Sequence, residues 1–304
     1  MGRRRPHEGE PAIRQHDDTM PLVSVLTPSL DQAEWLPDNL RSVACQTHPR
    51  VEHIVMDGGS TDGTVALLEA AGDGVTWRSE PDRGQADAVN KALAASSGDI
   101  IGWINSDDAY FDCRVVADVV AFFAKNPDVD VVYGHAAQIT ADGHVIQMLW
   151  APPFDRGLLM LLDPITQPSA FVRRRALSPP MLDETFHFAM DYALWLRLER
   201  DGRRFARIDR ICAIDRHQPA RKSSTITDVH AADLGRLAAT YGIETSAERE
   251  RTRSSFYRSQ RIMGALLVPR VRGDLAFTAP ADLRAGLLGR QLLIRRSDWP
   301  QELR

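Results

Sequence analysis

Short apolar runs along this chain alternate with longer stretches in which apolar residues recur every three or four positions. The runs, rich in β-branched residues, predict strands at 22–27, 51–56, 75–79, 100–104 and 129–133. The amphipathic stretches between them predict helices at 32–46, 62–71, 85–97 and 113–125. Because the connections are short and strands alternate with helices, the pattern favours an α/β fold with a mostly parallel sheet flanked by helices.

The pattern changes beyond the fifth predicted strand. Residues 135–149 predict a hairpin around Asp142 and Gly143, which would add an antiparallel part to the sheet. Further strands are predicted at 166–173, 204–208 and 211–216, and further helices at 188–201 and 226–241.

Three segments differ in composition. Residues 1–20 are polar and contain prolines, so we expect a disordered tail before a domain at 21–240. Residues 241–304 are expected to form a basic helical extension, since the stretch from Arg249 onward holds twelve arginines against five acidic residues. Its apolar runs, 262–268 and 287–294, fit either peripheral contact with an anionic membrane surface or helices packed on the domain.

Charge and cysteine content narrow the class of protein. The 304 residues are 43% hydrophobic with a net charge of −4, which allows a sizeable core and argues against nucleic-acid binding. Cys45, Cys113 and Cys212 are far apart and form no CxxC, which predicts no disulfide, no zinc site and a reducing compartment. No secretory signal and no apolar run near 20 residues is found, so we expect a cytoplasmic protein, with the inner membrane face as an alternative.

Acidic residues follow two of the predicted parallel strands. Asp57 ends the second strand, and Asn105-Ser106-Asp107-Asp108 follows the fourth. A parallel sheet brings both strand ends to one edge, where open α/β sheets bind ligands. Adjacent carboxylates there suit a hard divalent cation, although capping of the following helix explains them equally well. Neither G-x-G-x-x-G nor a P-loop motif is present, which argues against nicotinamide and P-loop chemistry.

Five blocks together resemble the family 2 glycosyltransferases with the GT-A fold. They are VSVLTPSLDQAEWLPDNLRSVACQT, VEHIVMDGGSTDGT, DRGQADAVNKAL, GDIIGWINSDD and MDYALWLRL, and they lie in the family's order within residues 21–220. The resemblance implies inverting, metal-assisted transfer of a sugar from a nucleotide-sugar donor, with uridine as the expected base and Mn²⁺ or Mg²⁺ as cofactor. The implied acceptor is a glycan or a lipid-linked molecule.

The resemblance also assigns roles to residues. Asp107 is the expected metal ligand with Asp108 in support, and His217 is a further metal candidate. Asn105 stands where the family's DXD motif has its first acid. The expected donor-binding residues are Thr27, Pro28, Ser29, Asp57, Arg83, Asn105 and Ser106. An alternative for Arg83 is a solvated arginine after a turn.

The expected catalytic base is Asp191, which matches the second acid of the family's Glu-Asp pair, with Met190 in place of the first. The alternative is an acid stabilised by the dipole of its helix. Gln167 and Ser169 resemble an acceptor-side block. Two other functions stay open: a nucleotidyltransferase that makes a sugar nucleotide, and a domain that binds a sugar nucleotide or glycan without turnover.

Overall fold

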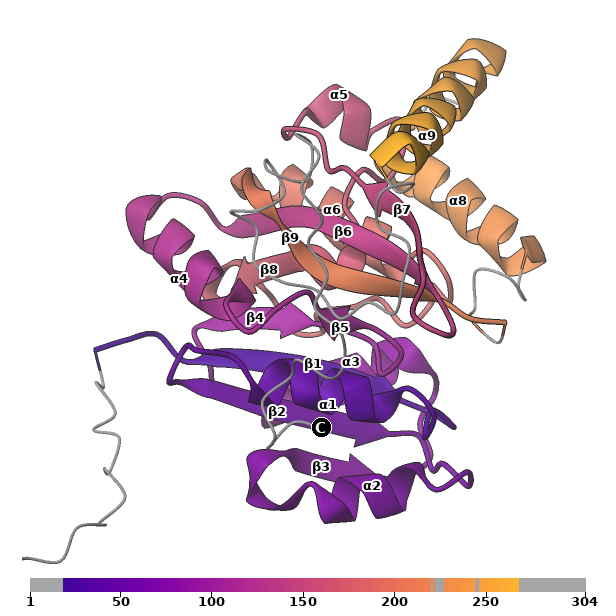
Figure 1. Cartoon of the computed structure of the whole chain (residues 1–304). Helices are drawn as coiled ribbons and strands as arrows, with labels where there is room; N and C mark the ends of the chain where they lie inside the picture. The colour runs from indigo at the N-terminus through magenta and orange to yellow at the C-terminus, as the bar shows by residue number, and fades with distance from the viewer. Residues whose placement is uncertain (1–18, 220, 222–226, 244–245, 268–304) are drawn as a thin grey trace, which may run out of the picture.

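A computed structural model describes residues 19–219, 221, 227–243 and 246–267, so most of the predicted tail lies outside the described residues. The described strands form one sheet in the order β3-β2-β1-β4-β8-β6-β9-β5, with β7 beside β6 (Figure 1). Their bounds are β1 (Val23–Ser29), β2 (Val51–Asp57), β3 (Thr76–Ser79), β4 (Ile100–Trp103), β5 (Ala109–Tyr110), β6 (Val131–Thr140), β7 (Val145–Leu149), β8 (Ala170–Arg173) and β9 (Phe205–His217).

The first four strands make the parallel half that the sequence predicts. β1 lies between β2 and β4 and runs parallel to both, with Ser29 opposite Asp57. The carboxyl ends of β2 and β4 therefore meet at one edge, as expected. The first strand extends beyond the predicted 22–27, because β1 continues through Pro28 to Ser29. The pairing of β1 with β4 ends at Leu26, so Pro28, which has no N–H, interrupts no hydrogen bond to β4.

The second half of the sheet is mixed, which confirms the predicted antiparallel part. β8 runs antiparallel to both β4 and β6, and β6 and β7 form the predicted hairpin. The strands predicted at 204–208 and 211–216 are one long strand, β9, whose register against β6 shifts near His135. Only the second half of the strand predicted at 166–173 forms, as β8, because Gln167–Ser169 is a 3-10 turn.

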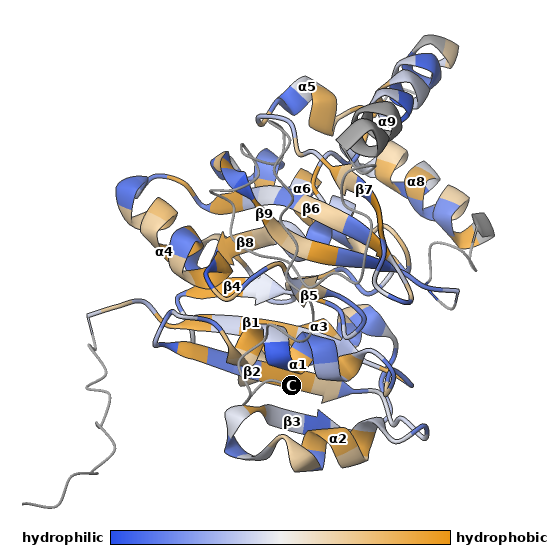
Figure 2. Ribbon diagram, in the orientation of Figure 1, coloured by the Kyte–Doolittle hydropathy of each residue, from blue (hydrophilic) through white to orange (hydrophobic). Residues whose placement is uncertain are grey.

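Helices cover both faces of the sheet. They are α1 (Leu36–Ala44), α2 (Thr64–Ala70), α3 (Gln85–Ala95), α4 (Val115–Lys125), α5 (Arg156–Leu159), α6 (Met190–Arg200), α8 (Thr227–Tyr241) and α9 (Ala247–Leu267). Apolar residues of α3 and α6 pack on one face, and those of α1 and α4 pack on the other. Apolar residues accordingly concentrate in the strands and the inward sides of these helices (Figure 2). The result is an α/β fold of the predicted kind.

The predicted C-terminal extension begins with α9, which lies near β7 (Figure 1). The second apolar run, 287–294, lies outside the described residues. Within the described part of the chain, no helix is long and apolar enough to cross a membrane. Membrane contact through this extension stays a prediction.

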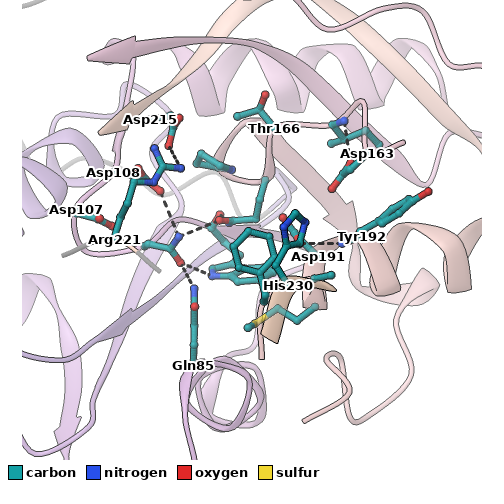
Figure 3. Close-up of a pocket in the computed structure, with 18 of the residues that line it drawn as sticks. Gln85, Asp107, Asp108, Asp163, Thr166, Asp191, Tyr192, Asp215, Arg221 and His230 are labelled. Carbon is teal, nitrogen blue, oxygen red and sulfur yellow. Dashed lines mark hydrogen bonds and ion pairs between the residues drawn. The ribbon is translucent and has the colours of Figure 1, made fainter. Parts of the chain in front are cut away.

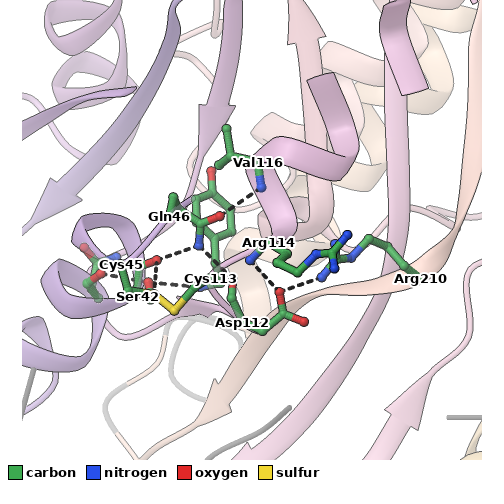
Figure 4. Close-up of a disulfide and its surroundings, with 10 residues drawn as sticks. Ser42, Cys45, Gln46, Asp112, Cys113, Arg114, Val116 and Arg210 are labelled. Atoms are coloured by element: carbon green, nitrogen blue, oxygen red, sulfur yellow. Dashed lines mark hydrogen bonds and ion pairs between the residues drawn. A yellow bond between two sulfur atoms is a disulfide. The ribbon is translucent and has the colours of Figure 1, made fainter. Parts of the chain in front are cut away.

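The prediction that the cysteines form no disulfide is wrong. Cys45, directly after α1, and Cys113, in the loop before α4, are joined by a disulfide (Figure 4). Gln46 fixes the two segments beside it, because its amide donates to the Asp112 carbonyl at 2.8 Å and accepts from the Val116 amide at 2.9 Å. Sequence spacing does not reveal this pairing, since the fold alone brings residues 68 positions apart together. The cysteine count therefore gives no support to a reducing compartment.

Candidate active site

One cavity of about 1020 Å³ lies at the carboxyl edge of the parallel strands (Figure 3). Its walls come from the ends of β1 and β4, the start of α3, the segment 161–168, the start of α6, the end of β9, and α8 and α9. A cavity of this size accommodates a ligand larger than a single sugar. It brings Asn105, Ser106, Asp107 and Asp108 into the same space as Asp191.

Asn105 is the centre of a hydrogen-bond network at one end of the cavity. Its Oδ1 accepts from Gln85 Nε2 at 2.6 Å and from the indole Nε1 of Trp103 at 3.1 Å. Its Nδ2 donates to Gln167 Oε1 at 3.2 Å and to Asp108 Oδ2 at 3.4 Å. Because the indole N–H can only donate, the orientation of the carboxamide is fixed. An aspartate could accept the first two bonds but could not donate the last two, so this network specifies asparagine.

Three carboxylates gather beside this network: Asp107, Asp108 and Asp215. Burial raises the pKa of Asp107, and the nearby Asp215 raises it further, although Gln218 Nε2 donates to Asp107 Oδ2 at 3.2 Å. Burial, followed by the charges of Asp107 and Asp215, raises the pKa of Asp108 well above its usual range. Arg221 pairs with Asp215 at 3.4 Å and offsets part of this effect, but burial still disfavours the charged form of Asp107 and Asp108.

A divalent cation fits this chemistry. Carboxylate oxygens are the donors that Mg²⁺ and Mn²⁺ prefer, and a cation would relieve the repulsion among the three acids. Among the described residues, no group of three or more His, Cys, Asp or Glu side chains is close enough to enclose a metal. A cation held through Asp107 would therefore take its other ligands from water or from a bound phosphate, which is usual for Mg²⁺.

Asp191 lies across the cavity in the first turn of α6 (Figure 3). Its Oδ1 accepts from the Tyr192 amide at 2.9 Å, and burial raises its pKa to about 6. Asp163, from the loop after α5, shares this end of the cavity, and burial and the charge of Asp191 raise its pKa well above the usual range. Asp191 can therefore exchange a proton near neutral pH, which suits a general base.

Asp233 of α8 holds the segment before α6 in place. Its side chain is fully buried, and Oδ2 accepts from the backbone amides of His187, Phe188 and Ala189 at 2.9, 2.7 and 3.2 Å. Its Oδ1 pairs with Arg236 at 2.7 Å. Burial alone would raise the pKa of Asp233, but these bonds outweigh it and the pKa lies below the usual range. One charged side chain thus fixes the backbone that leads directly into Met190 and Asp191.

Several other predicted residues lie around the cavity wall. Pro28 and Ser29 line the cavity, and Gln167 lines it as part of the Asn105 network. Thr27 is fully buried and does not line the cavity; its Oγ1 lies 3.0 Å from His53 Nε2. Ser169 is also buried, and its hydroxyl donates to the Gly134 carbonyl at 2.9 Å.

Besides Thr27 and Ser169, three more predicted residues do not line the cavity: Asp57, Arg83 and His217. Asp57 closes the turn after β2, where its Oδ2 accepts from the Ser60 amide at 2.9 Å and from Ser79 Oγ at 2.6 Å. The side chain of Arg83 is 71% exposed and pairs with Asp87 and Glu184, in keeping with its alternative as a solvated arginine. His217 is exposed at the end of β9, beside Arg221.

The structure also reveals site residues that the sequence pattern misses. They lie outside the five sequence blocks: Asp163 and Gln218 in loops, Asp215 in β9 and Asp233 in α8. Gln85 lies within a block, and its position as the first residue of α3, next to the strand edge, is the signal that could have identified it.

The chain belongs to Glycosyl transferase family 2, whose sequence profile matches residues 24–190, more than half of the chain. An uncharacterized glycosyltransferase of Mycobacterium tuberculosis is 39% identical over 116 residues, which cover 38% of this chain and 44% of that protein. A PGL/p-HBAD biosynthesis glycosyltransferase of Mycobacterium bovis is 28% identical over 158 residues, covering 51% of this chain and 60% of that protein. The aligned part thus spans about half the length of these relatives.

Solved structures confirm the GT-A type of fold. Staphylococcus aureus TarS 1–349 in complex with UDP-GlcNAc superposes with a TM-score of 0.57 at 19% identity, covering 76% of this chain and 69% of that TarS chain. Glucosyl-3-phosphoglycerate synthase from Mycobacterium tuberculosis, in complex with Mg²⁺ and UDP, superposes with a TM-score of 0.54 at 21% identity. The superposition covers 74% of this chain and 81% of that chain.

Proposed function

We propose that this chain transfers a sugar from a nucleoside-diphosphate sugar, with uridine as the base, to a hydroxyl of an acceptor, with inversion at the anomeric carbon. The observation that carries the proposal is a single cavity with Asp107 at one end and Asp191, with its raised pKa, at the other. Family membership and the UDP-sugar complex of TarS support the donor class.

The donor would lie along the end of the cavity formed by β1, β4 and α3. Its diphosphate would approach Asp107 and the N-terminus of α3, where the helix dipole favours an anion. A divalent cation there would neutralise the diphosphate and so improve it as a leaving group. Asn105 and Gln85 keep this wall rigid and polar.

Asp191 would act on the acceptor. Its carboxylate takes the proton of the acceptor hydroxyl while that oxygen forms a bond to the anomeric carbon and the bond to the diphosphate oxygen breaks. General-base help of this kind is worth about 10²–10⁴-fold in rate. Asp233 contributes indirectly, because it holds the start of α6 and hence the position of Asp191.

The test compares turnover of a panel of UDP-sugars, with Mn²⁺, by the wild type and by Asp191→Asn. We expect a loss of about 10²-fold or more in the variant, with UDP binding retained in a thermal-shift assay. Asp201→Asn, at the exposed far end of α6, is the matched control and should keep wild-type turnover. An Asp191→Asn enzyme that works at the wild-type rate would overturn the base assignment, and UDP binding without any turnover would favour the binding-only alternative.

Asp107→Ala tests the metal assignment separately. We expect the stabilisation by UDP with Mn²⁺ to be lost in this variant, because the cation loses its protein ligand. A ligand at 100 times its dissociation constant adds about 2.7 kcal/mol of stability, which is easily measured. Stabilisation by UDP that is unchanged by the variant, or by a chelator, would refute the role of Asp107.

A further inference from the structure

One face of α9 carries polar and aromatic residues where a packed helix ordinarily carries apolar ones. Glu250, Arg253, Ser254, Tyr257 and Arg258 all line the cavity. Their spacing places them on a single side of the helix. A helix that packs against a domain core buries an apolar stripe of this spacing. The polar face of α9 instead forms part of the wall of an open cavity.

Tyr257 brings this face next to the proposed base. Its hydroxyl donates to the Asp163 carbonyl at 3.5 Å. Burial of the hydroxyl, with the charges of Asp163 and Asp191 close by, raises the pKa of Tyr257 to about 12. The residue is nevertheless 44% exposed, among the most exposed large hydrophobic residues of the described chain. Tyr257 therefore lies against the Asp163 loop and lines the same cavity as Asp191, to which the acceptor would present its hydroxyl.

The chemistry of the face distinguishes among possible occupants. An anionic group is disfavoured, because Arg253 already pairs with Glu250 at 2.8 Å. The remaining cation of the face, Arg258, is outnumbered by the carboxyl groups of Asp163 and Asp191, which line the same cavity. A hydrocarbon chain is disfavoured because three of the residues along the face are charged.

A sugar ring fits the same face well. The C–H face of a pyranose can lie on an aromatic ring, while its hydroxyl edges exchange hydrogen bonds with carboxylate, guanidinium and hydroxyl groups. Ligand sites commonly combine an aromatic surface with a few polar groups that fix orientation. Tyr257 supplies the first, and Glu250, Arg253 and Ser254 supply the second.

We propose that this face of α9 binds a sugar unit of the acceptor, with its ring stacked on Tyr257 and its hydroxyls on Glu250, Arg253 and Ser254. The enzyme then extends an existing glycan or glycoside rather than adding a first sugar to a non-carbohydrate molecule. The inference rests on the proposed function, since it takes the hydroxyl facing Asp191 to be that of the acceptor.

The test measures binding of methyl pyranosides of glucose, galactose, mannose and rhamnose by saturation-transfer NMR, with the protein held saturated in UDP and Mg²⁺. At least one glycoside should bind saturably to the wild type. Tyr257→Leu, which removes the ring but keeps a good helix former, should weaken its dissociation constant about tenfold. Tyr257→Phe keeps the ring and should stay within about twofold, as should the matched control Arg251→Gln on the exposed side of α9.

Two results would overturn the inference: no saturable binding of any glycoside by the wild type, or equal binding by wild type and Tyr257→Leu. UDP affinity, measured on the same samples, separates this failure from that of the proposed function. UDP binding without glycoside binding refutes only the acceptor site, whereas absence of UDP binding refutes the donor assignment. An unchanged UDP affinity in Tyr257→Leu shows that the variant is folded.

Discussion

Replacing Asp233 with asparagine should destabilise the protein and slow its turnover while leaving donor binding intact. The carboxylate accepts three consecutive backbone N–H bonds before α6 and pairs with Arg236. Hydrogen bonds to a charged group are worth about 1.5–3 kcal/mol each, against about 0.5–1.5 for neutral partners. The amide keeps the shape but loses the charge, and its NH₂ must face a donor on one side. We therefore expect a loss of about 2–4 kcal/mol in the free energy of unfolding.

Urea unfolding followed by tryptophan fluorescence measures this loss through linear extrapolation. The kinetic consequence is a fall in kcat of about 10²-fold, since small misplacement of a catalytic group costs that much. Arg236→Gln is the control, because it removes the half-exposed partner but keeps the backbone bonds, and it should cost about 1 kcal/mol or less. Equal losses in the two variants, or an Asp233→Asn enzyme with wild-type stability and kcat, would refute the reasoning.

The pH dependence of the unfolding free energy tests the role of Asp233 independently. The pKa of Asp233 is lower in the folded protein than its ordinary value. Its contribution is therefore complete above the ordinary carboxyl pKa of about 4 and is lost as pH falls through the lower folded value. Asp233→Asn should thus reduce the difference in unfolding free energy between neutral and acidic solution.

Three further predictions follow from the site and the disulfide. Asn105→Asp should lower stability by about 1–3 kcal/mol in urea, because a carboxylate cannot donate to Gln167 and repels Asp108; an unchanged midpoint would contradict the network. Turnover should fall as pH drops through about 6, since Asp191 is protonated below that pKa, and a flat profile from pH 5 to 7 would contradict its role as base. Thiol titration in denaturant should find one reactive cysteine without reductant and three after reduction; three without reductant would disprove the disulfide.

The sequence predicts the parallel half of the sheet well because its signals are local. Each strand there is a short apolar run, and the order of strands follows from short connections. The meeting of the ends of β2 and β4 at one edge was therefore predictable. β5 was not, because two residues at 109–110 carry no periodicity and become a strand only through pairing with β9.

The residues of the candidate site likewise fall into those that the sequence predicts and those that it does not. Asp107, Asp108 and Asp191 lie in recognisable blocks, and all three line the cavity. Asp163 and Asp215 come from segments without a motif, and only the folded chain brings them near those acids. The Cys45–Cys113 disulfide escaped prediction for the same reason, since its two segments approach each other only in the folded chain.

The two departures from the family pattern have a common physical explanation in contacts that are remote in sequence. Asn105 replaces an acid, but its Nδ2 gives Asp108 and Gln167 a donor, which a second carboxylate beside Asp108 could not provide. Met190 also replaces an acid, and there the buried carboxylate of Asp233 holds the backbone that positions Asp191. At position 105 a carboxylate would have lain beside the buried Asp108, where repulsion raises the free energy of the folded state. Asn105 and Met190 are therefore compatible with a working site whose supporting residues, Gln167 and Asp233, lie elsewhere in the chain.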